Sequence, residues 1–236
     1  MWVCIGRGKY GEGSQYYSHL GHVIASSNKD DEDINRARFN FIGQSNNTSC
    51  YFSKLNVFTR FKLFQSYCTS FYGSELWDLY NDKVATLCTD WRKAMRVIWR
   101  LPRQTHSYLL HLISGCLPIY DELCRRFINF ARICVNHSSS LVRFVSSYCL
   151  FHGNFSSFLK RNLNLCCHRY QCSAHVLLHG FLRPLFFTHA HFSSVNEHQR
   201  HTASFALELI LLINETLSNG LLRTEIYDIL TSICCD

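Results

Sequence analysis

Proline is nearly absent from this chain. Its 236 residues contain three prolines, at positions 102, 118 and 184. Proline lacks a backbone N–H and its ring clashes with the preceding turn, so long proline-free stretches permit long helices. A hydrophobic fraction of 47% is enough to bury a sizeable core around such helices. The sequence therefore predicts a mainly helical protein.

Apolar residues spaced three and four apart locate the first helices. Ile34, Ala37 and Phe41 predict a helix over about 29–47. Ser27 or Asn28 would cap it, and the acidic run 30–33 would lie at its N-terminus, where the helix dipole favours negative charge, and not in a metal site.

The next helix is expected over about 55–71. Leu63, Tyr67 and Phe71 repeat every four residues, as do Phe64 and Cys68. The aromatic string YCTSFYGSELW (67–77) then crosses a break at Gly73. We expect Tyr67 and Phe71 in the core and Trp77 packed at the corner. Glu75 is interpreted as a structural acceptor of hydrogen bonds from the backbone or a tyrosine.

A helix over about 82–100 is predicted to have two contrasting faces. Its apolar side comprises Trp91, Ala94, Met95, Ile98 and Leu101. Its basic side comprises Arg92, Lys93, Arg96, Arg100 and Arg103, with Trp91 and Trp99 flanking it. Pro102 ends the helix. Clustered cations of this kind bind phosphate backbones without sequence preference. Lys54, Arg60 and Lys62 on the preceding helix could extend the track.

Further helices are expected downstream. One follows Pro118, with a buried stripe of Leu123, Phe127, Phe130 and Cys134 and with Arg125 and Arg126 able to pair with Asp121 and Glu122. The run HSSS (137–140) interrupts the pattern, and helices follow at about 203–216 and 223–234. Near the N-terminus, QYYSHLGHVI (15–24) suits a short strand or hairpin.

The formal net charge of +7 is concentrated in the middle of the chain. Residues 51–150 hold thirteen Lys and Arg against six Asp and Glu, and residues 201–236 hold one against five. A basic centre suits a polyanionic partner, and the alternative is an ordinary solvated surface.

Neither secretion nor membrane insertion is indicated. The start MWVCIGRGKY has no apolar signal region, and no run of 18 apolar residues occurs. We expect an intracellular protein, in the cytoplasm or nucleus, whose thirteen cysteines are mostly reduced core residues. GRGKYGEG (6–13) lacks the spacing of a phosphate-binding loop, and no small-molecule substrate is expected.

A cluster in NLCCHRYQCSAHVLLHG (164–180) could supply zinc ligands: Cys167, Cys172, His175 and His179. Its spacing does not match the usual pair-and-pair pattern, and Cys166 competes with Cys167 for one position. Zinc is therefore the less favoured interpretation, and no cofactor is expected.

Several strings resemble non-LTR (LINE-type, jockey- or CR1-like) retrotransposon reverse transcriptases. They are YYSHLGHVI, YFSKL, LFQSYCTSFYGSELW and WRKAMRVIWRLPRQTHSYLLHLISGCLPIYDELCRRFINF, with a similar tail in LELILLINETLSNGLLRTEIYDILTSIC. The resemblance implies a short N-terminal β-hairpin, a helical thumb bundle and a helical C-terminal domain. The corresponding segments are a primer-grip remnant with a connecting helix (1–50), a thumb (51–136) and a C-terminal region (137–236). His19, Leu20, Gly21 and His22 match the primer grip.

The family's catalytic acids hold two Mg²⁺ ions in a palm that precedes the primer grip, and only Glu12 lies in the eighteen residues before His19. The resemblance therefore implies a truncated remnant without polymerase or endonuclease chemistry, whose residual role is binding RNA or an RNA–DNA duplex. The alternatives are a fragment of an active RNA-directed DNA polymerase, a co-opted helical interaction module and a decayed reading frame.

Overall fold

The computed structural model describes residues 16–19, 22–25, 30–152, 157–179, 197–216 and 232. The chain is mainly helical, as predicted. Two short segments near the N-terminus, β1 (Tyr16–His19) and β2 (His22–Ala25), pair antiparallel, with Tyr16 opposite Ala25. In the described residues, all other regular secondary structure is helical.

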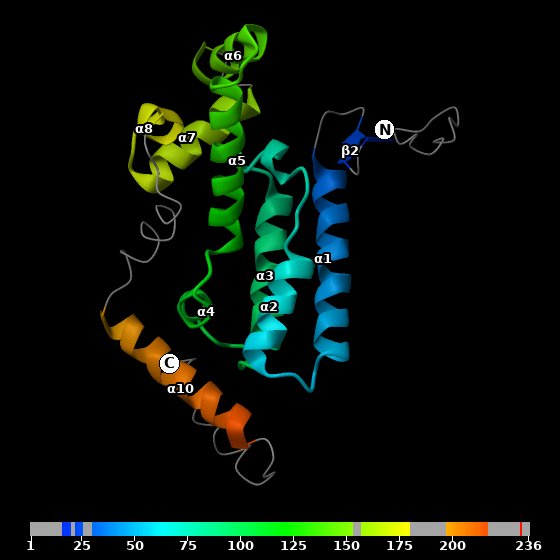
Figure 1. The fold of residues 1–236 in the computed structure, drawn as a ribbon, viewed down its shortest axis with the longest axis vertical. Helices are drawn as coiled ribbons and strands as arrows, with labels where there is room; N and C mark the ends of the chain where they lie inside the picture. The colour runs from blue at the N-terminus through cyan, green and yellow to red at the C-terminus, as the bar shows by residue number, and fades with distance from the viewer. Residues whose placement is uncertain are drawn as a thin grey trace.

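Three helices lie side by side and form the main bundle (Figure 1). They are α1 (Asp31–Tyr51), α2 (Val57–Cys68) and α3 (Asp82–Trp99). Asn56 caps α2 and Asn81 caps α3, because each side chain accepts a hydrogen bond from the backbone two residues on, at 2.8 and 2.9 Å. The predicted positions of these three helices are confirmed to within a few residues.

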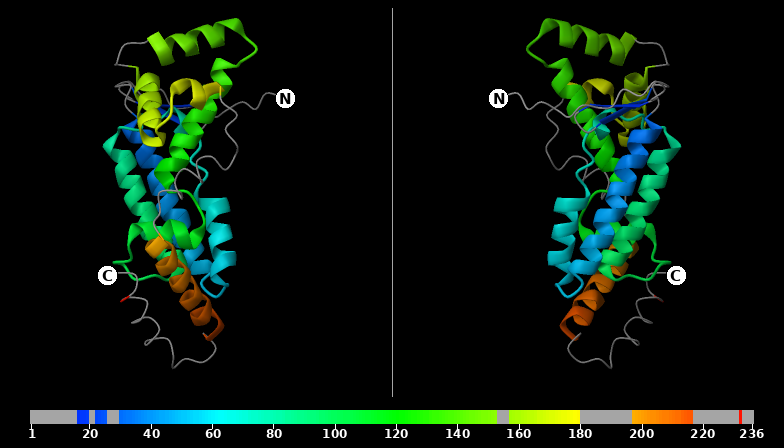
Figure 2. Two further views of the ribbon diagram at one scale, coloured as in Figure 1. Left: turned by 90° about the vertical axis from the view of Figure 1, so that its left-hand side faces the viewer. Right: turned by 90° about the vertical axis from the view of Figure 1, so that its right-hand side faces the viewer.

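The other helices extend the bundle at both ends (Figures 1 and 2). The short helix η1 (Ser74–Leu76) packs on α5 (Ile119–Val135), and α4 (Ser107–Ser114) packs on α10 (Glu197–Thr216). At the other end lie α6 (Ser140–Ser147), η2 (Tyr148–His152), α7 (Phe158–Tyr170) and α8 (Ala174–His179). The break after α5 and the helix before Thr216 match the sequence prediction, whereas the predicted helix 223–234 lies outside the described residues, apart from Ser232.

The buried residues form one hydrophobic cluster that runs from Ile34 in α1 to Ile210 in α10. Its largest fully buried side chains include Trp77, Trp99 and Phe41. The cluster draws on all three segments that the sequence suggested as domains, and their boundaries stay a prediction.

Three predicted core positions in the helices are not buried. Tyr67 is 64% exposed, because α2 buries the neighbouring face of Phe61, Phe64 and Cys68 against α1 and α3. In α5 the predicted stripe is shifted: Phe130 and Cys134 are half-buried, and the packed face comprises Leu123, Cys124, Phe127, Ile128, Ala131 and Val135.

Candidate nucleic-acid interface

The sequence of α3 sets its apolar face inward. Trp91, Met95 and Ile98 are at most 3% exposed, and Leu101 is buried after the helix end. The helix stops at Arg100, whose φ of 55° is left-handed and whose N–H closes the last turn on the Arg96 carbonyl. The predicted apolar face is confirmed, and the basic residues lie on the other side.

Of three cations at this surface, Lys93 and Arg103 are exposed and Arg92 is half-buried. Lys93 is 69% exposed and contacts Asp90 at 3.1 Å. Arg92 donates to the Thr89 hydroxyl at 3.0 Å, and Arg103 is exposed beyond the helix end. Within the described parts of the chain, neither Arg92 nor Arg103 forms an ion pair. Their charge is therefore available to an anionic partner.

Two further arginines of the basic side have structural contacts. Arg96 donates two hydrogen bonds to the Thr105 carbonyl, at 2.6 and 3.1 Å, and so holds the loop that follows α3. Arg100 donates to the Ser53 carbonyl at 2.7 Å, across the junction with α2. Because Ser53 precedes Lys54, this bond brings the start of α2 beside the end of α3 at the lower end of the bundle (Figure 1).

Arg60 does not belong to the interface, contrary to the prediction. It is 3% exposed and donates a hydrogen bond to the Ile98 carbonyl near the end of α3. Burial, with a contribution from the nearby Arg100 charge, lowers the pKa of Arg60 to about 10, so it stays protonated at neutral pH. Its role is to join α2 to α3. Lys54 and Lys62, by contrast, are exposed.

Acids are missing from both segments that carry these cations. Residues 51–74 and 91–120 contain no Asp or Glu. Lys54, Lys62 and Arg103 therefore have no acidic neighbour in the sequence, whereas Lys93 is paired with Asp90, one helical turn before it. Such a surface attracts phosphates in a salt-dependent way.

The tryptophans do not offer rings to a ligand on the basic side. Trp99 is 1% exposed and packs edge-on against Phe58 at 5.4 Å and against Phe61 at 5.2 Å. Trp91 is also buried. The expectation that both flank the basic face is therefore wrong for Trp99: its ring lies in the core.

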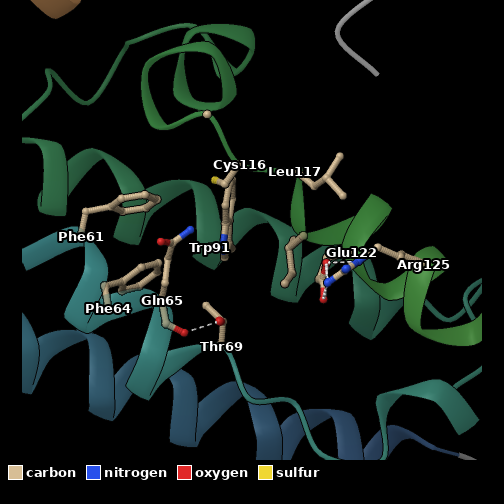
Figure 3. A pocket seen from close by; sticks show the side chains of 11 residues that line it. Phe61, Phe64, Gln65, Thr69, Trp91, Cys116, Leu117, Glu122 and Arg125 are labelled. Carbon is tan, nitrogen blue, oxygen red and sulfur yellow. Dashed lines mark hydrogen bonds and ion pairs between the residues drawn. The ribbon is translucent and has the colours of Figure 1, made fainter. Parts of the chain in front are cut away.

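A cavity of about 350 Å³ opens between α2, α3 and the start of α5 (Figure 3). Phe61, Phe64, Trp91, Leu117 and Ile119 give it apolar walls. Its polar rim includes Glu122 and Arg125, which pair with each other at 2.7 Å. The rim is electrically neutral, so this cavity has no preference for an anion.

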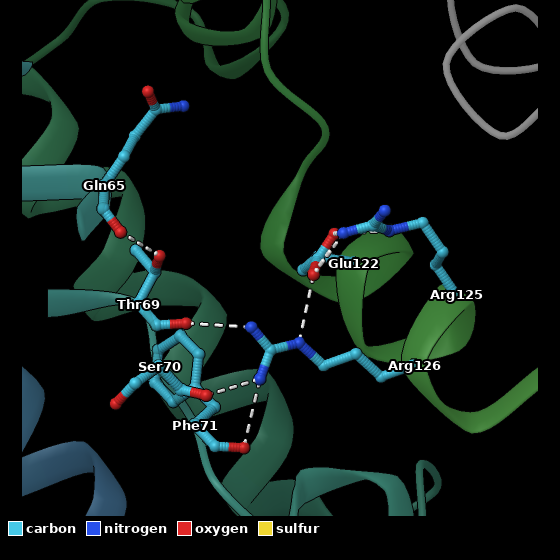
Figure 4. A network of polar contacts seen from close by, with 7 residues as sticks. All are labelled: Gln65, Thr69, Ser70, Phe71, Glu122, Arg125 and Arg126. Atoms are coloured by element: carbon cyan, nitrogen blue, oxygen red, sulfur yellow. Dashed lines mark hydrogen bonds and ion pairs between the residues drawn. The ribbon is translucent and has the colours of Figure 1, made fainter. Parts of the chain in front are cut away.

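Arg126 binds the first half of the aromatic string YCTSFYGSELW (67–77) (Figure 4). It donates to the carbonyls of Thr69, Ser70 and Phe71 at 2.6–3.1 Å, and also to Glu122 at 3.0 Å. The Glu122 pairing with both arginines confirms the sequence expectation. The three carbonyl contacts were not predicted, because their donors and acceptors lie about 55 residues apart.

The acidic run at the start of α1 holds the other end of the same string. Asp33 is fully buried and accepts a hydrogen bond from the Trp77 indole at 2.8 Å. Asp30 accepts from the backbone of Asp78 at 2.8 Å, and Asp31 accepts from Asn81 at 2.7 Å. The placement of these acids at a helix N-terminus is confirmed. Their carboxylate oxygens accept hydrogen bonds that join α1 to residues 77–81.

The predictions for the string hold for Phe71, Gly73 and Trp77 but not for Glu75. Phe71 and Trp77 are buried, as predicted. Gly73 has a left-handed conformation, with φ of 83°, and separates the helices on either side, also as predicted. The Glu75 carboxylate has no hydrogen-bond partner among the residues that the structure describes, so its expected structural contact is not seen.

Two other predicted sites are only partly covered. Of the primer-grip match, Leu20 and Gly21 lie outside the described residues, while the backbones of His19 and His22 are paired in the register of β1 and β2. In the zinc candidate, the rings of His175 and His179 are 5.2 Å apart. These two histidines, Cys167 and Cys172 do not gather into a group: in the described part of the chain, no three His, Cys, Asp or Glu side chains come together as metal ligands would.

A scan of protein-family models and searches of curated proteins and solved structures found no match to this chain. Among the helices that the structure describes, none combines the length and the hydrophobicity needed to span a bilayer.

Proposed function

We propose that the chain binds the phosphate backbone of RNA or of an RNA–DNA duplex, as the thumb of a LINE-type reverse transcriptase would. The observation that carries the proposal is the junction of α2 and α3. There the Arg100–Ser53 hydrogen bond places Lys54 beside the end of α3, the helix that carries Arg92 and Lys93, and Arg103 follows in the next loop. We name these four residues, with Lys62, the basic face.

The chemistry of the basic face favours backbone contact over base reading. Its cations are lysines and arginines on helices and loops, and the nearest tryptophan rings are buried. Neutralising phosphates releases counterions, so binding of this kind weakens steeply with salt and varies little with sequence. Polymerase or nuclease chemistry is not part of the proposal, because the acids expected to hold metal ions in such a family have no counterpart among the candidate residues.

Removing two charges from the basic face tests the proposal. The variant Lys54→Gln/Arg103→Gln should bind a 20-base-pair RNA–DNA duplex about tenfold more weakly at low salt, and its salt slope should fall by about 2, one for each lost phosphate contact. Fluorescence anisotropy with a labelled duplex measures both quantities.

The control is Lys83→Gln/Arg143→Gln, which makes the same charge change on other parts of the surface. It should bind nearly as well as the unmodified chain. Equal weakening by both double variants would mean that net charge alone governs binding and that the basic face has no special role.

A further inference from the structure

A second cavity, of about 390 Å³, is enclosed by α3, α4, the start of α5 and α7. Trp91 and Ile119 line it and also line the first cavity. Its other lining residues are Ala85, Cys88, Arg92, His111, Pro118, Tyr120 and Arg169. The volume lies in the range that small ligands occupy, about 300–1,000 Å³.

Three of the nine residues that line the second cavity carry flat rings: Trp91, His111 and Tyr120. The rings of Trp91 and His111 are stacked, with centroids 5.3 Å apart and planes 15° apart. The Arg169 guanidinium lies over the Tyr120 ring, 5.1 Å from its centroid. Flat aromatic and guanidinium surfaces bind planar groups by stacking, with energies of about 1–3 kcal/mol per nucleobase.

The charge of the lining is positive. Two arginines line the second cavity and no Asp or Glu does. Asp121 compensates Arg169 through hydrogen bonds of 2.6 and 2.8 Å, whereas Arg92 has the neutral Thr89 hydroxyl as its described partner. One positive charge is left, which matches the single charge of a phosphodiester. The first cavity, with its Glu122–Arg125 pair, lacks this excess.

The Cys88 thiol, which lines the second cavity, lies near both arginines and near Asp121. Burial raises the pKa of Cys88 to about 11, while Arg92 and Arg169 each act to lower it. Because Asp121 acts against Arg169, an anion at this wall would be stabilised mainly by Arg92.

We propose that the second cavity takes one nucleobase of a bound strand by stacking, with the adjoining phosphate on Arg92. The inference rests on the proposed backbone binding and adds to it a site for a single nucleotide. Arg92 belongs both to the basic face and to the cavity wall, so a strand that follows the basic face passes the mouth of the cavity.

Calorimetric titration of the full chain with adenosine 5′-monophosphate tests the site directly. We expect saturable binding, with adenosine and inorganic phosphate each binding at least tenfold more weakly, because each lacks one of the two contacts. Arg92→Ala should weaken adenosine monophosphate binding about tenfold. Binding of inorganic phosphate as tight as that of the nucleotide would overturn the base-stacking part of the proposal.

Filling the second cavity gives a sharper comparison. Ala85 lines it from an exposed position on α3, so Ala85→Trp should block the nucleotide, whereas Thr86→Trp, exposed on the same turn but not in the lining, should not. Circular dichroism and thermal unfolding confirm that each variant is folded. Unchanged nucleotide binding by Ala85→Trp would contradict the assignment.

The two proposals fail in different ways. If the duplex binds through the basic face but adenosine monophosphate does not bind, only the nucleotide site is wrong. If the nucleotide binds and is lost in Ala85→Trp while the duplex does not bind at low salt, the nucleotide site stands and the proposed function is wrong.

Discussion

Single buried polar residues fix the conformation around the aromatic string. Asp33 is the clearest case: it is fully buried, accepts the Trp77 indole hydrogen at 2.8 Å and pairs with Arg36 at 2.6 Å. A buried indole N–H that loses its acceptor costs more than the hydrogen bond itself contributes. We predict that Asp33→Ala lowers the free energy of unfolding by about 2–3 kcal/mol, measured by urea denaturation.

The matched control for Asp33 is Glu32→Gln, an exposed acid on the same helical turn. It should change the free energy of unfolding by less than about 0.5 kcal/mol. Asp33→Asn should recover part of the loss, since an amide oxygen can still accept from the indole. Equal effects of Asp33→Ala and Glu32→Gln would show that the buried contact is unimportant.

Arg60 shows that residue type alone does not predict whether a charged side chain is buried. Its charge suggested a surface contact, but the structure buries it between α2 and α3, where it donates to Ile98. Nothing local in the sequence distinguishes it from Lys54 or Lys62, because burial depends on which helix packs above it. Trp99 is similar: helical spacing places it near the basic side, and only packing against Phe58 and Phe61 shows that it is covered.

At the scale of helices, an ion pair joins α1 to α3. Arg38 donates to Asp90 at 2.5 Å, and Lys93 contacts the same carboxylate. Burial acts to raise the pKa of Asp90, but the hydrogen bonds and charges of Arg38 and Lys93 outweigh it and hold that pKa below its ordinary value. The folded state therefore favours the ionised carboxylate.

This shift predicts a dependence of stability on pH. A depressed folded-state pKa contributes stability above the unfolded value of about 4, and that contribution is lost as the pH falls further. The difference in unfolding free energy between the unmodified chain and Asp90→Asn should be constant above about pH 5 and shrink towards pH 3. Asp82→Asn, exposed on the first turn of α3, is the control. A difference that does not change between pH 7 and pH 3 would contradict the ion-pair account.

Most helices were predictable because their signals are local. The apolar spacing of α1, α3 and α10 and the stop before Pro102 are contained in each segment. The exact buried face of α2 and of α5 could not be predicted from the sequence. Each helix has two adjacent apolar stripes, and its contacts with other helices determine which of them is buried. α4 also escaped prediction, because an eight-residue helix gives too few turns for a clear period.

At the scale of the molecule, many of the long-range polar contacts in the described residues converge on one segment. Residues 69–81 form hydrogen bonds with α1, α5 and α7: the Trp77 indole donates to Asp33, Arg126 donates to the Thr69 carbonyl, and Asn162 accepts from the Leu79 N–H and donates to the Trp77 carbonyl. The aromatic string YCTSFYGSELW (67–77) is thus part of the segment through which distant helices are connected. Its role in the fold is structural, and the basic face at the α2–α3 junction is a separate feature.

The location of the basic face could be predicted from the sequence, but the residues that belong to it could not. Charge counting located it in residues 51–150, and helical spacing selected α3. Sequence could not show that Arg96 and Arg100 are engaged with Thr105 and Ser53, nor that a positively charged cavity adjoins Arg92. These depend on contacts between segments far apart in the chain.

Duplex binding as a function of salt is the most direct test of the central proposal. We predict that the unmodified chain binds a labelled RNA–DNA duplex at 50 mM salt and that log K falls linearly with log salt, with a slope of about −3 to −5 for three to five phosphate contacts. Two unrelated duplex sequences should give the same line within experimental error. No binding at 50 mM salt, or binding that does not weaken at 200 mM, would contradict the account.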